Sequence, residues 1–269
     1  MNNQVILHIA HYAAPYKGNF IASLEALEEK LKENGNNSMV YVFPKTCEER
    51  DWMNEFKQKH VVYFVKMPQK ICKLFLDGEL IKQLNTIFQK ENPVIIHSHF
   101  DGYDEYCVKA NNINAQVVWH EHNTRALVSN KLKQIYQKIN FLHQYGVVGK
   151  SVHIIALYKD FENFLRKYGY RNEVLILPNG ISEERISFKI KKRSDAINFL
   201  TFGGRAEHKG IDLLFKSINE LKKKNLDIKV YFNITEGSDT RETANTFFRG
   251  EIPEEVKLIP QTENVSELF

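Results

Sequence analysis

Phe199-Leu-Thr-Phe-Gly-Gly-Arg-Ala-Glu-His-Lys-Gly210 runs from a short apolar segment through a glycine pair into a helical pattern. Glycines let backbone amides approach a phosphate closely, and the N-terminus of the following helix carries partial positive charge. Arg205 can bind phosphate oxygens through two parallel hydrogen bonds, and Lys209 adds a point charge. The stretch fits a diphosphate-binding turn, and it equally fits a tight turn whose cations face solvent.

Short apolar runs alternate with helical patterns on both sides of this stretch, which predicts parallel βαβ units. One face of the helix at 20–32 carries Phe20, Leu24, Leu27 and Leu31, and one face of the helix after residue 210 carries Leu213, Leu214, Ile218 and Leu221. Leu80, Leu84, Ile87 and Phe88 mark a further helix. The predicted strands lie at 5–9, 39–43, 61–65, 94–96, 116–119, 153–157, 174–177, 197–202, 228–232 and 256–259.

The domain boundary is expected after the turn Pro178-Asn179-Gly180, where the charged, non-periodic stretch SEERISFKIKKRSDA begins. We therefore predict one domain at 1–182 and a second at 196–269. Both read as doubly wound α/β domains with parallel sheets.

Composition limits the class of protein. The chain has 269 residues, 43% hydrophobic and 26% charged, and no apolar run approaches the roughly 18 residues that span a membrane. Its three cysteines, Cys47, Cys72 and Cys107, show no metal-ligand spacing, which favours a cytoplasmic location. The net charge is +4, and the lysines at 131, 133 and 138 fit either solvated helix faces or a patch that contacts an anionic membrane.

FGGRAEHKGIDLLFKSI resembles the signature that opens the C-terminal domain of family 4 retaining glycosyltransferases. Leu177-Pro-Asn-Gly-Ile181 is similar to the interdomain segment of that family. Tyr16-Lys-Gly-Asn19 resembles its glycine loop. Val94-Ile-Ile-His-Ser-His99 and Val117-Val-Trp-His-Glu-His-Asn123 are similar to two of its strands. The motifs occur in the family's order along nearly the whole chain.

The resemblance implies a GT-B fold of two Rossmann-like domains and transfer of a sugar from a UDP- or GDP-sugar with retention, without a cofactor. Arg205 and Lys209 match the clamp on the donor diphosphate, together with the turn at Gly204. Gly18 matches the loop that faces the donor phosphates, and His122 matches the histidine near the donor sugar. The implied acceptor is a glycan or a lipid-linked molecule, with no nucleic-acid partner.

The remaining histidines have a plainer interpretation. His97, His99 and His120 lie on or beside strands, where hydrogen-bonded core histidines are common. The spacings HSH and HEH put pairs of histidines on one strand face, but no cysteine or carboxylate cluster completes a metal site, so none is expected. Asp101, Asp104 and Glu105 could face a cleft, although solvation of a loop is the favoured interpretation.

The sequence also departs from the family pattern. No PS-x-x-EGFG region with its pair of glutamates is present, so a donor domain that is truncated is expected, with the strand around Phe199 left as an apolar edge. The alternatives are an inactive fragment that binds a partner and a GT-B nucleotide-sugar epimerase.

Overall fold

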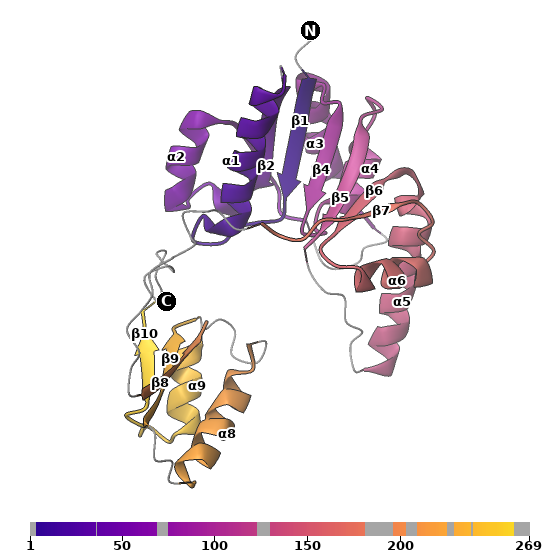
Figure 1. Cartoon of the computed structure of the whole chain (residues 1–269). Helices are drawn as coiled ribbons and strands as arrows, with labels where there is room; N and C mark the ends of the chain where they lie inside the picture. Colours follow the sequence, from indigo (N-terminus) through magenta and orange to yellow (C-terminus); the bar gives the residue numbers. More distant parts are fainter. Residues whose placement is uncertain are drawn as a thin grey trace. The chain divides into compact units, whose positions relative to one another are not determined.

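The computed structural model describes residues 4–35, 37–68, 75–122, 130–180, 196–202, 209–224, 229–237 and 239–260. The chain divides into two compact units, Met1–Ile181 and Ser182–Phe269. Each unit contains one sheet whose strands are all parallel (Figure 1). The class expected from the sequence, α/β with a second and smaller parallel sheet, is confirmed.

Unit 1 is a seven-stranded sheet with the order β3-β2-β1-β4-β5-β6-β7. This order places the first strand at the centre, with the chain winding outward first to one side and then to the other. The strands are β1 (Gln4–Ala10), β2 (Asn37–Pro44), β3 (Val61–Val65), β4 (Ile95–His99), β5 (Gln116–Glu121), β6 (His153–Ala156) and β7 (Val174–Ile176). All seven occur where the sequence predicts them, within a few residues at the ends.

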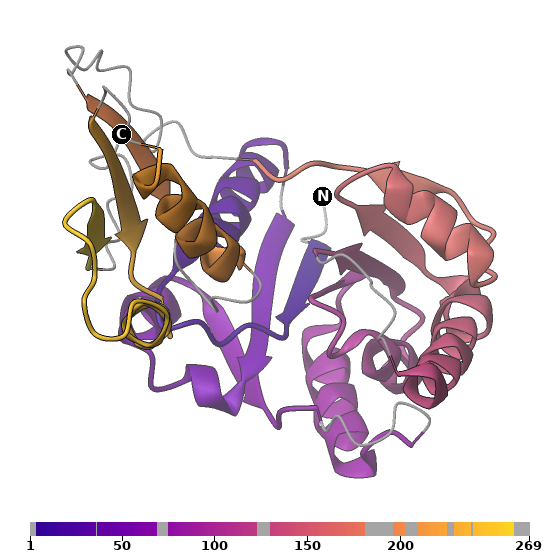
Figure 2. The ribbon, with the colours of Figure 1, turned by 90° about the horizontal axis from the view of Figure 1, so that it is seen from below.

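Helices cover both faces of this sheet, as Figure 2 shows from below. On one face, α1 (Gly18–Glu33) and α2 (Asp51–Lys59) pack with β1 and β2 in a core that includes Ile21, Tyr41 and Phe56. The larger core on the opposite face includes Leu84 and Trp119. Its helices are α3 (Gly78–Glu91), α4 (Asp104–Ala110), α5 (Lys131–Gly146) and α6 (Asp160–Lys167), and the short 3-10 turns are η1 (Lys45–Cys47) and η2 (Val148–Ser151).

The buried face of α1 differs from the predicted one. Ile21, Leu24 and Glu28 are buried, whereas Leu27 is 40% exposed. Glu28 is held inside because its carboxylate accepts a 2.7 Å hydrogen bond from the Tyr41 hydroxyl and lies 2.8 Å from the Lys32 ammonium. Of the predicted face, Leu24 is buried and Phe20 and Leu31 pack against the core, so the prediction is wrong for Leu27.

Unit 2 is a three-stranded sheet with the order β10-β9-β8. Its elements are β8 (Ala196–Thr201), α8 (Ile211–Lys222), β9 (Lys229–Thr235), α9 (Thr240–Phe247) and β10 (Val256–Ile259). Ile211, Phe215 and Ile218 form the buried face of α8, and Leu213 is 62% exposed, so its assignment to the buried face is wrong.

Among the described strands of unit 2, β8 lies at an edge. The apolar residues Ile197 and Phe199 on it are about half exposed, at 46% and 49%. The Phe199 ring stacks on Phe232 of β9 at 5.3 Å between ring centroids. The apolar character expected for this strand is therefore present. Within the described residues, no helix has the length and hydropathy needed to cross a membrane.

Candidate active site

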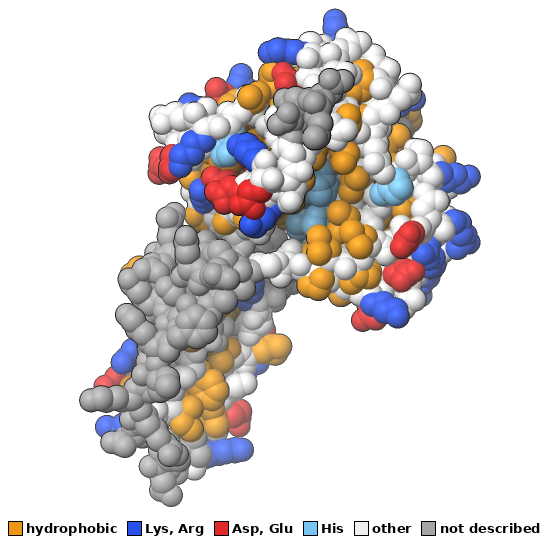
Figure 3. Space-filling model, turned by 45° about the horizontal axis from the view of Figure 1, so that its top comes forward, with side chains coloured by type: hydrophobic (Ala, Val, Ile, Leu, Met, Phe, Trp, Pro, Cys, Tyr) orange, Lys and Arg blue, Asp and Glu red, His pale blue; other side chains and the backbone are white. Residues whose placement is uncertain are grey.

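Histidines gather where three adjacent strands of unit 1 end. Side chains alternate between the faces of a strand, so His97 and His99 of β4 point to one face, as His120 of β5 and His122 just after it do. The parallel register then places His8 of β1 opposite His97, and His99 opposite His120. We call these residues the histidine ladder: His8, His97, His99, His120 and His122. Figure 3 shows histidine side chains gathered on this face of the molecule, beside apolar ones.

A chain of hydrogen-bonding distances runs through the ladder. Nδ1 of His8 lies 3.0 Å from Nε2 of His99, and Nδ1 of His99 lies 3.0 Å from Nε2 of His122. A neutral imidazole donates from one nitrogen and accepts at the other. His99 must therefore donate to one neighbour and accept from the other, so the tautomers of His8 and His122 are coupled through it.

The other contacts in the ladder are between ring faces. His97 and His120 are nearly parallel, with an interplanar angle of 7° and centroids 5.5 Å apart. His120 stacks on His122 at 4.1 Å, and His97 lies 4.1 Å from His99. Such close stacking disfavours charge on two neighbouring rings at once, because adjacent imidazolium ions would repel each other.

Burial keeps these imidazoles neutral. It lowers the pKa of His8 and of His122 to about 3, with a smaller effect from His120, and it lowers the pKa of His120 itself to about 4. The pKa values of His97 and His99 also fall well below the ordinary range, for the same reason. At neutral pH the ladder can therefore donate and accept hydrogen bonds but carries no charge.

Two overlapping sets of imidazole nitrogens are close enough to be considered as metal ligands. His8, His97 and His99 form one set and His99, His120 and His122 the other, each with its nitrogens within 4.8 Å of one another. Ring nitrogens bind metals through lone pairs that lie in the ring plane. Both nitrogens of His99 are also within hydrogen-bonding distance of other histidines. The arrangement fits a hydrogen-bonded ladder better than a metal centre, and the absence of a metal stays a prediction.

Aromatic residues that the sequence analysis missed surround His122. The Phe100 ring stacks on it at 4.3 Å, and Phe20 of α1 meets it edge-on at 5.5 Å. Phe100 has φ of +65° and Asp101 has φ of +53°, a conformation that costs on the order of 1–3 kcal/mol for a residue other than glycine. Strain of this kind is concentrated at functional sites. Position directly after a strand was the only sequence signal for Phe100.

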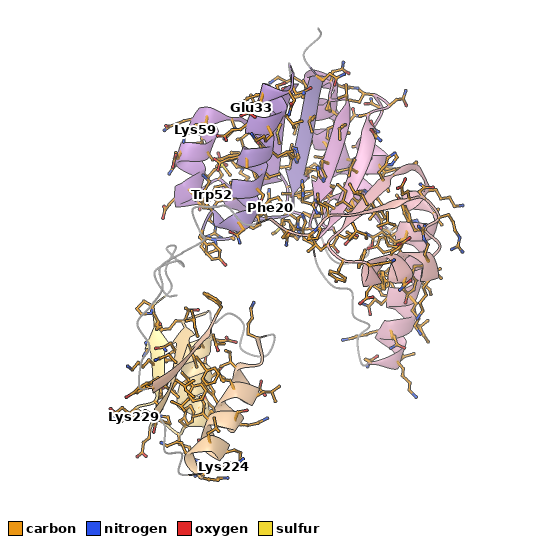
Figure 4. All side chains as sticks on the ribbon, in the orientation of Figure 1. Phe20, Glu33, Trp52, Lys59, Lys224 and Lys229 are labelled. Carbon is orange, nitrogen blue, oxygen red and sulfur yellow. The ribbon has the colours of Figure 1, made fainter. Side chains whose placement is uncertain are left out.

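Gly18 lies at the same edge of unit 1. It is the first residue of α1 with φ of +62°, and a Cβ there would lie 2.9 Å from the Tyr12 hydroxyl. That hydroxyl lies 3.2 Å from the carbonyl oxygens of Tyr16 and Lys17, to which it donates. Only glycine fits this turn without strain. Phe20, two residues later, contacts His122 from the first turn of α1. Figure 4 shows Phe20 at this N-terminal end of α1, beside the carboxyl ends of the strands.

The remaining predicted site residues belong to unit 2. Lys209 is exposed and precedes Gly210, the residue with φ of +66° at the N-cap of α8. Gly204 and Arg205 lie outside the described residues. Of the predicted site residues, Gly18 and His122 belong to the described part of unit 1, where Phe20 of α1 contacts His122. The roles of all these residues stay predictions.

For two of the three acidic residues after β4, Asp104 and Glu105, the expected solvation of a loop is wrong. Asp104 and Glu105 are buried in α4, with exposed fractions of 1% and 7%. The Ser98 hydroxyl donates to Asp104 at 2.7 Å, and the Trp119 indole N–H donates to the Asp104 carbonyl at 3.1 Å. These contacts hold α4 against the ends of β4 and β5, on the opposite face from the ladder.

The profile of Glycosyltransferase Family 4 matches residues 23–185, which cover most of unit 1 and more than half of the chain. The chain belongs to glycosyltransferase family 4. No curated protein matches its sequence.

Solved structures show that this family 4 chain has the GT-B fold. A glycosyltransferase from Rickettsia africae ESF-5 superimposes with a TM-score of 0.72 at 12% identity, covering 100% of this chain and 71% of that one. TarM gives 0.68 at 11% identity, with 98% and 78% covered. The UDP-GlcNAc 2-epimerase from Neisseria meningitidis bound to UDP-GlcNAc gives 0.56 at 13% identity, with 98% and 74% covered. At these identities the likeness shows the fold alone.

Proposed function

We propose that this family 4 glycosyltransferase moves a sugar from a UDP- or GDP-sugar to a hydroxyl of a glycan or lipid-linked acceptor, with retention of configuration. The observation that carries the proposal is the family match over residues 23–185. It is supported by the arrangement at the carboxyl edge of unit 1, where ligands bind in open α/β sheets. The epimerase with UDP-GlcNAc bound supports a nucleotide-sugar ligand for this fold.

In this proposal, Arg205 and Lys209 stabilise the departing diphosphate. Negative charge grows on the leaving group as the glycosidic bond breaks, and preorganised cations and backbone amides stabilise that charge most in the transition state. Gly204 and Gly18 would let backbone amides approach the phosphates. The clamp supplies positive charge through side chains, so the proposed reaction needs no cofactor or divalent ion.

His122 would act on the donor sugar as a neutral group. Its Nε2 faces His99, which leaves Nδ1 as the nitrogen that can contact a sugar hydroxyl. Because burial lowers its pKa to about 3, it would orient the sugar by a hydrogen bond and would not act as a charged acid.

The direct test is sugar transfer by the full chain. The protein is incubated with a panel of UDP- and GDP-sugars and a membrane lipid extract as acceptor, with and without EDTA, and the product's anomeric configuration is read by NMR. Transfer with retention that EDTA does not abolish supports the proposal. Inversion of configuration would contradict the proposed retention. Loss of activity with EDTA would contradict the proposed independence of a divalent ion.

The same assay separates the two alternatives. One alternative is a nucleotide-sugar epimerase, which the similarity to an epimerase favours. Such an enzyme would convert UDP-GlcNAc to its 2-epimer with no acceptor present. The other alternative is an inactive fragment that binds a partner. It would show neither transfer nor epimerisation, even where calorimetry detects nucleotide binding.

A further inference from the structure

One side of α5 is apolar and open to solvent. Five residues spaced as i, i+3, i+4, i+7 and i+10 lie on one face of a helix. We call them the α5 stripe, and their exposed fractions are Leu132 79%, Ile135 55%, Tyr136 44%, Ile139 50% and Leu142 49%. Exposed apolar patches of this kind mark interaction sites.

The other side of the helix explains why the stripe cannot turn inward. Phe141 packs edge-on against Phe164 of α6 at 5.1 Å, and the Tyr145 hydroxyl donates to Glu121 at 2.7 Å. Gln144 is fully buried. In Figure 1, α5 lies beside α6, and its N-terminal end extends past the carboxyl edge of the sheet.

The segment that contains the stripe carries charge of one sign. Residues 122–159 contain no aspartate or glutamate, although the chain as a whole has 33 acidic residues. By helical spacing, Lys131 and Lys138 border one side of the stripe and Lys133 the other. Apolar side chains flanked by lysines form the pattern of a helix that lies in the interface of an anionic bilayer.

A second copy of this chain fits the stripe poorly. The common two-fold interface places the same patch of both subunits face to face. Lysines would then meet lysines with no acidic residue of this segment between them, and the cores of protein interfaces are depleted in lysine. An anionic lipid surface instead supplies negative charge to every lysine at once.

We propose that the α5 stripe and its flanking lysines bind the surface of a bilayer that contains anionic lipid. The apolar side chains enter the headgroup region, and Lys131, Lys133 and Lys138 contact the lipid phosphates. This inference goes beyond the proposed sugar transfer, because binding to a bilayer needs neither donor nor acceptor.

The test is flotation of the full chain with vesicles. Vesicles of phosphatidylglycerol and phosphatidylcholine in equal amounts are compared with pure phosphatidylcholine, at low and high salt. We expect binding to the anionic vesicles that weakens as salt rises. Lys131→Gln/Lys133→Gln/Lys138→Gln should lower the partition coefficient on the order of 100-fold, since each lysine near an anionic surface contributes roughly fivefold. Leu132→Asn/Ile139→Asn should lower it at least tenfold.

Matched controls come from α8. Leu213→Asn replaces a leucine that is 62% exposed on another helix, and Lys216→Gln/Lys222→Gln/Lys223→Gln removes the same charge from that helix and its C-cap. Both controls should bind vesicles as the unaltered chain does, and circular dichroism checks that every variant is folded. Equal losses in the α5 and α8 variants would overturn the proposal. Equal binding to neutral and anionic vesicles would also overturn it. So would light scattering that shows a dimer of the unaltered chain and a monomer of Leu132→Asn/Ile139→Asn.

Discussion

His99 is the residue through which the ladder is connected, since each of its nitrogens lies 3.0 Å from another histidine. We predict that His99→Ala lowers the free energy of unfolding by about 1–3 kcal/mol, because it leaves buried imidazole nitrogens without partners. Urea denaturation measures this. The control is His153→Ala, which changes an exposed histidine of β6 and should have little effect. Equal stability of the two variants would show that the ladder contributes nothing to folding.

A second prediction concerns the effect of Arg205 and Lys209 on the rate of sugar transfer. Under the proposed function, Arg205→Ala should lower turnover by roughly a hundred- to thousandfold, or about 3–4 kcal/mol, because the contact is made to charge that develops in the transition state. Lys209→Ala should act in the same direction. Both cations act on one diphosphate, so the double variant should lose less than the product of the single losses. A fall of less than threefold for Arg205→Ala in steady-state kinetics would mean that these residues only cap a helix.

At the scale of single elements, α1 shows how one polar contact decides orientation. Glu28 is buried with Tyr41 and lies 2.8 Å from a ring nitrogen of His60, while the preceding residue, Leu27, is 40% exposed. Glu28→Ala should destabilise the protein by about 3 kcal/mol, since it leaves buried polar partners unpaired. The control, Glu33→Ala, removes an exposed carboxylate that pairs with Lys30, and its cost should stay below about 1 kcal/mol. Urea midpoints compare the two, and a loss for Glu28→Ala no larger than for Glu33→Ala would contradict this account.

At the scale of the whole molecule, the ladder makes unit 1 sensitive to acid. Above pH 6.5 the histidines are neutral in both the folded and unfolded chain and contribute no pH dependence. Below it the unfolded chain takes up protons, whereas folded His8 and His122, with pKa values near 3, do not. Stability should therefore fall as pH drops from 6.5 towards 3, by about 1.4 kcal/mol per pH unit for each such histidine.

Tryptophan fluorescence can follow this loss in unit 1 alone, because Trp52 and Trp119 are the only two tryptophans and both lie there. The midpoint of thermal unfolding should fall between pH 6.5 and 4, and less steeply for His8→Gln than for the unaltered chain. If the unfolding midpoints of the two proteins fell equally steeply with pH, groups other than His8 would cause the acid sensitivity.

The fold class and the family could both be predicted from the sequence. Every described strand was predicted because parallel strands buried on both faces form continuous apolar runs, as at Val40–Phe43, and this pattern is local. The motif Tyr16-Lys-Gly-Asn19 drew attention to Gly18, whereas its positive φ and its closeness to Tyr12 are seen only in the structure. For the turn at 203–208, sequence remains the only source, since those residues lie outside the described part of the chain.

Which side chains meet could not be predicted from the sequence and depends on the folded arrangement. His8, His99 and His122 are separated by 91 and 23 residues in the chain, and parallel register alone brings their rings together. The burial of Asp104, the inward turn of Glu28 and the exposure of the α5 stripe likewise depend on partners from distant segments. Hydrophobic spacing identifies an amphipathic helix, but it does not say which polar group finds a buried partner, because that depends on contacts made after the sheet has formed.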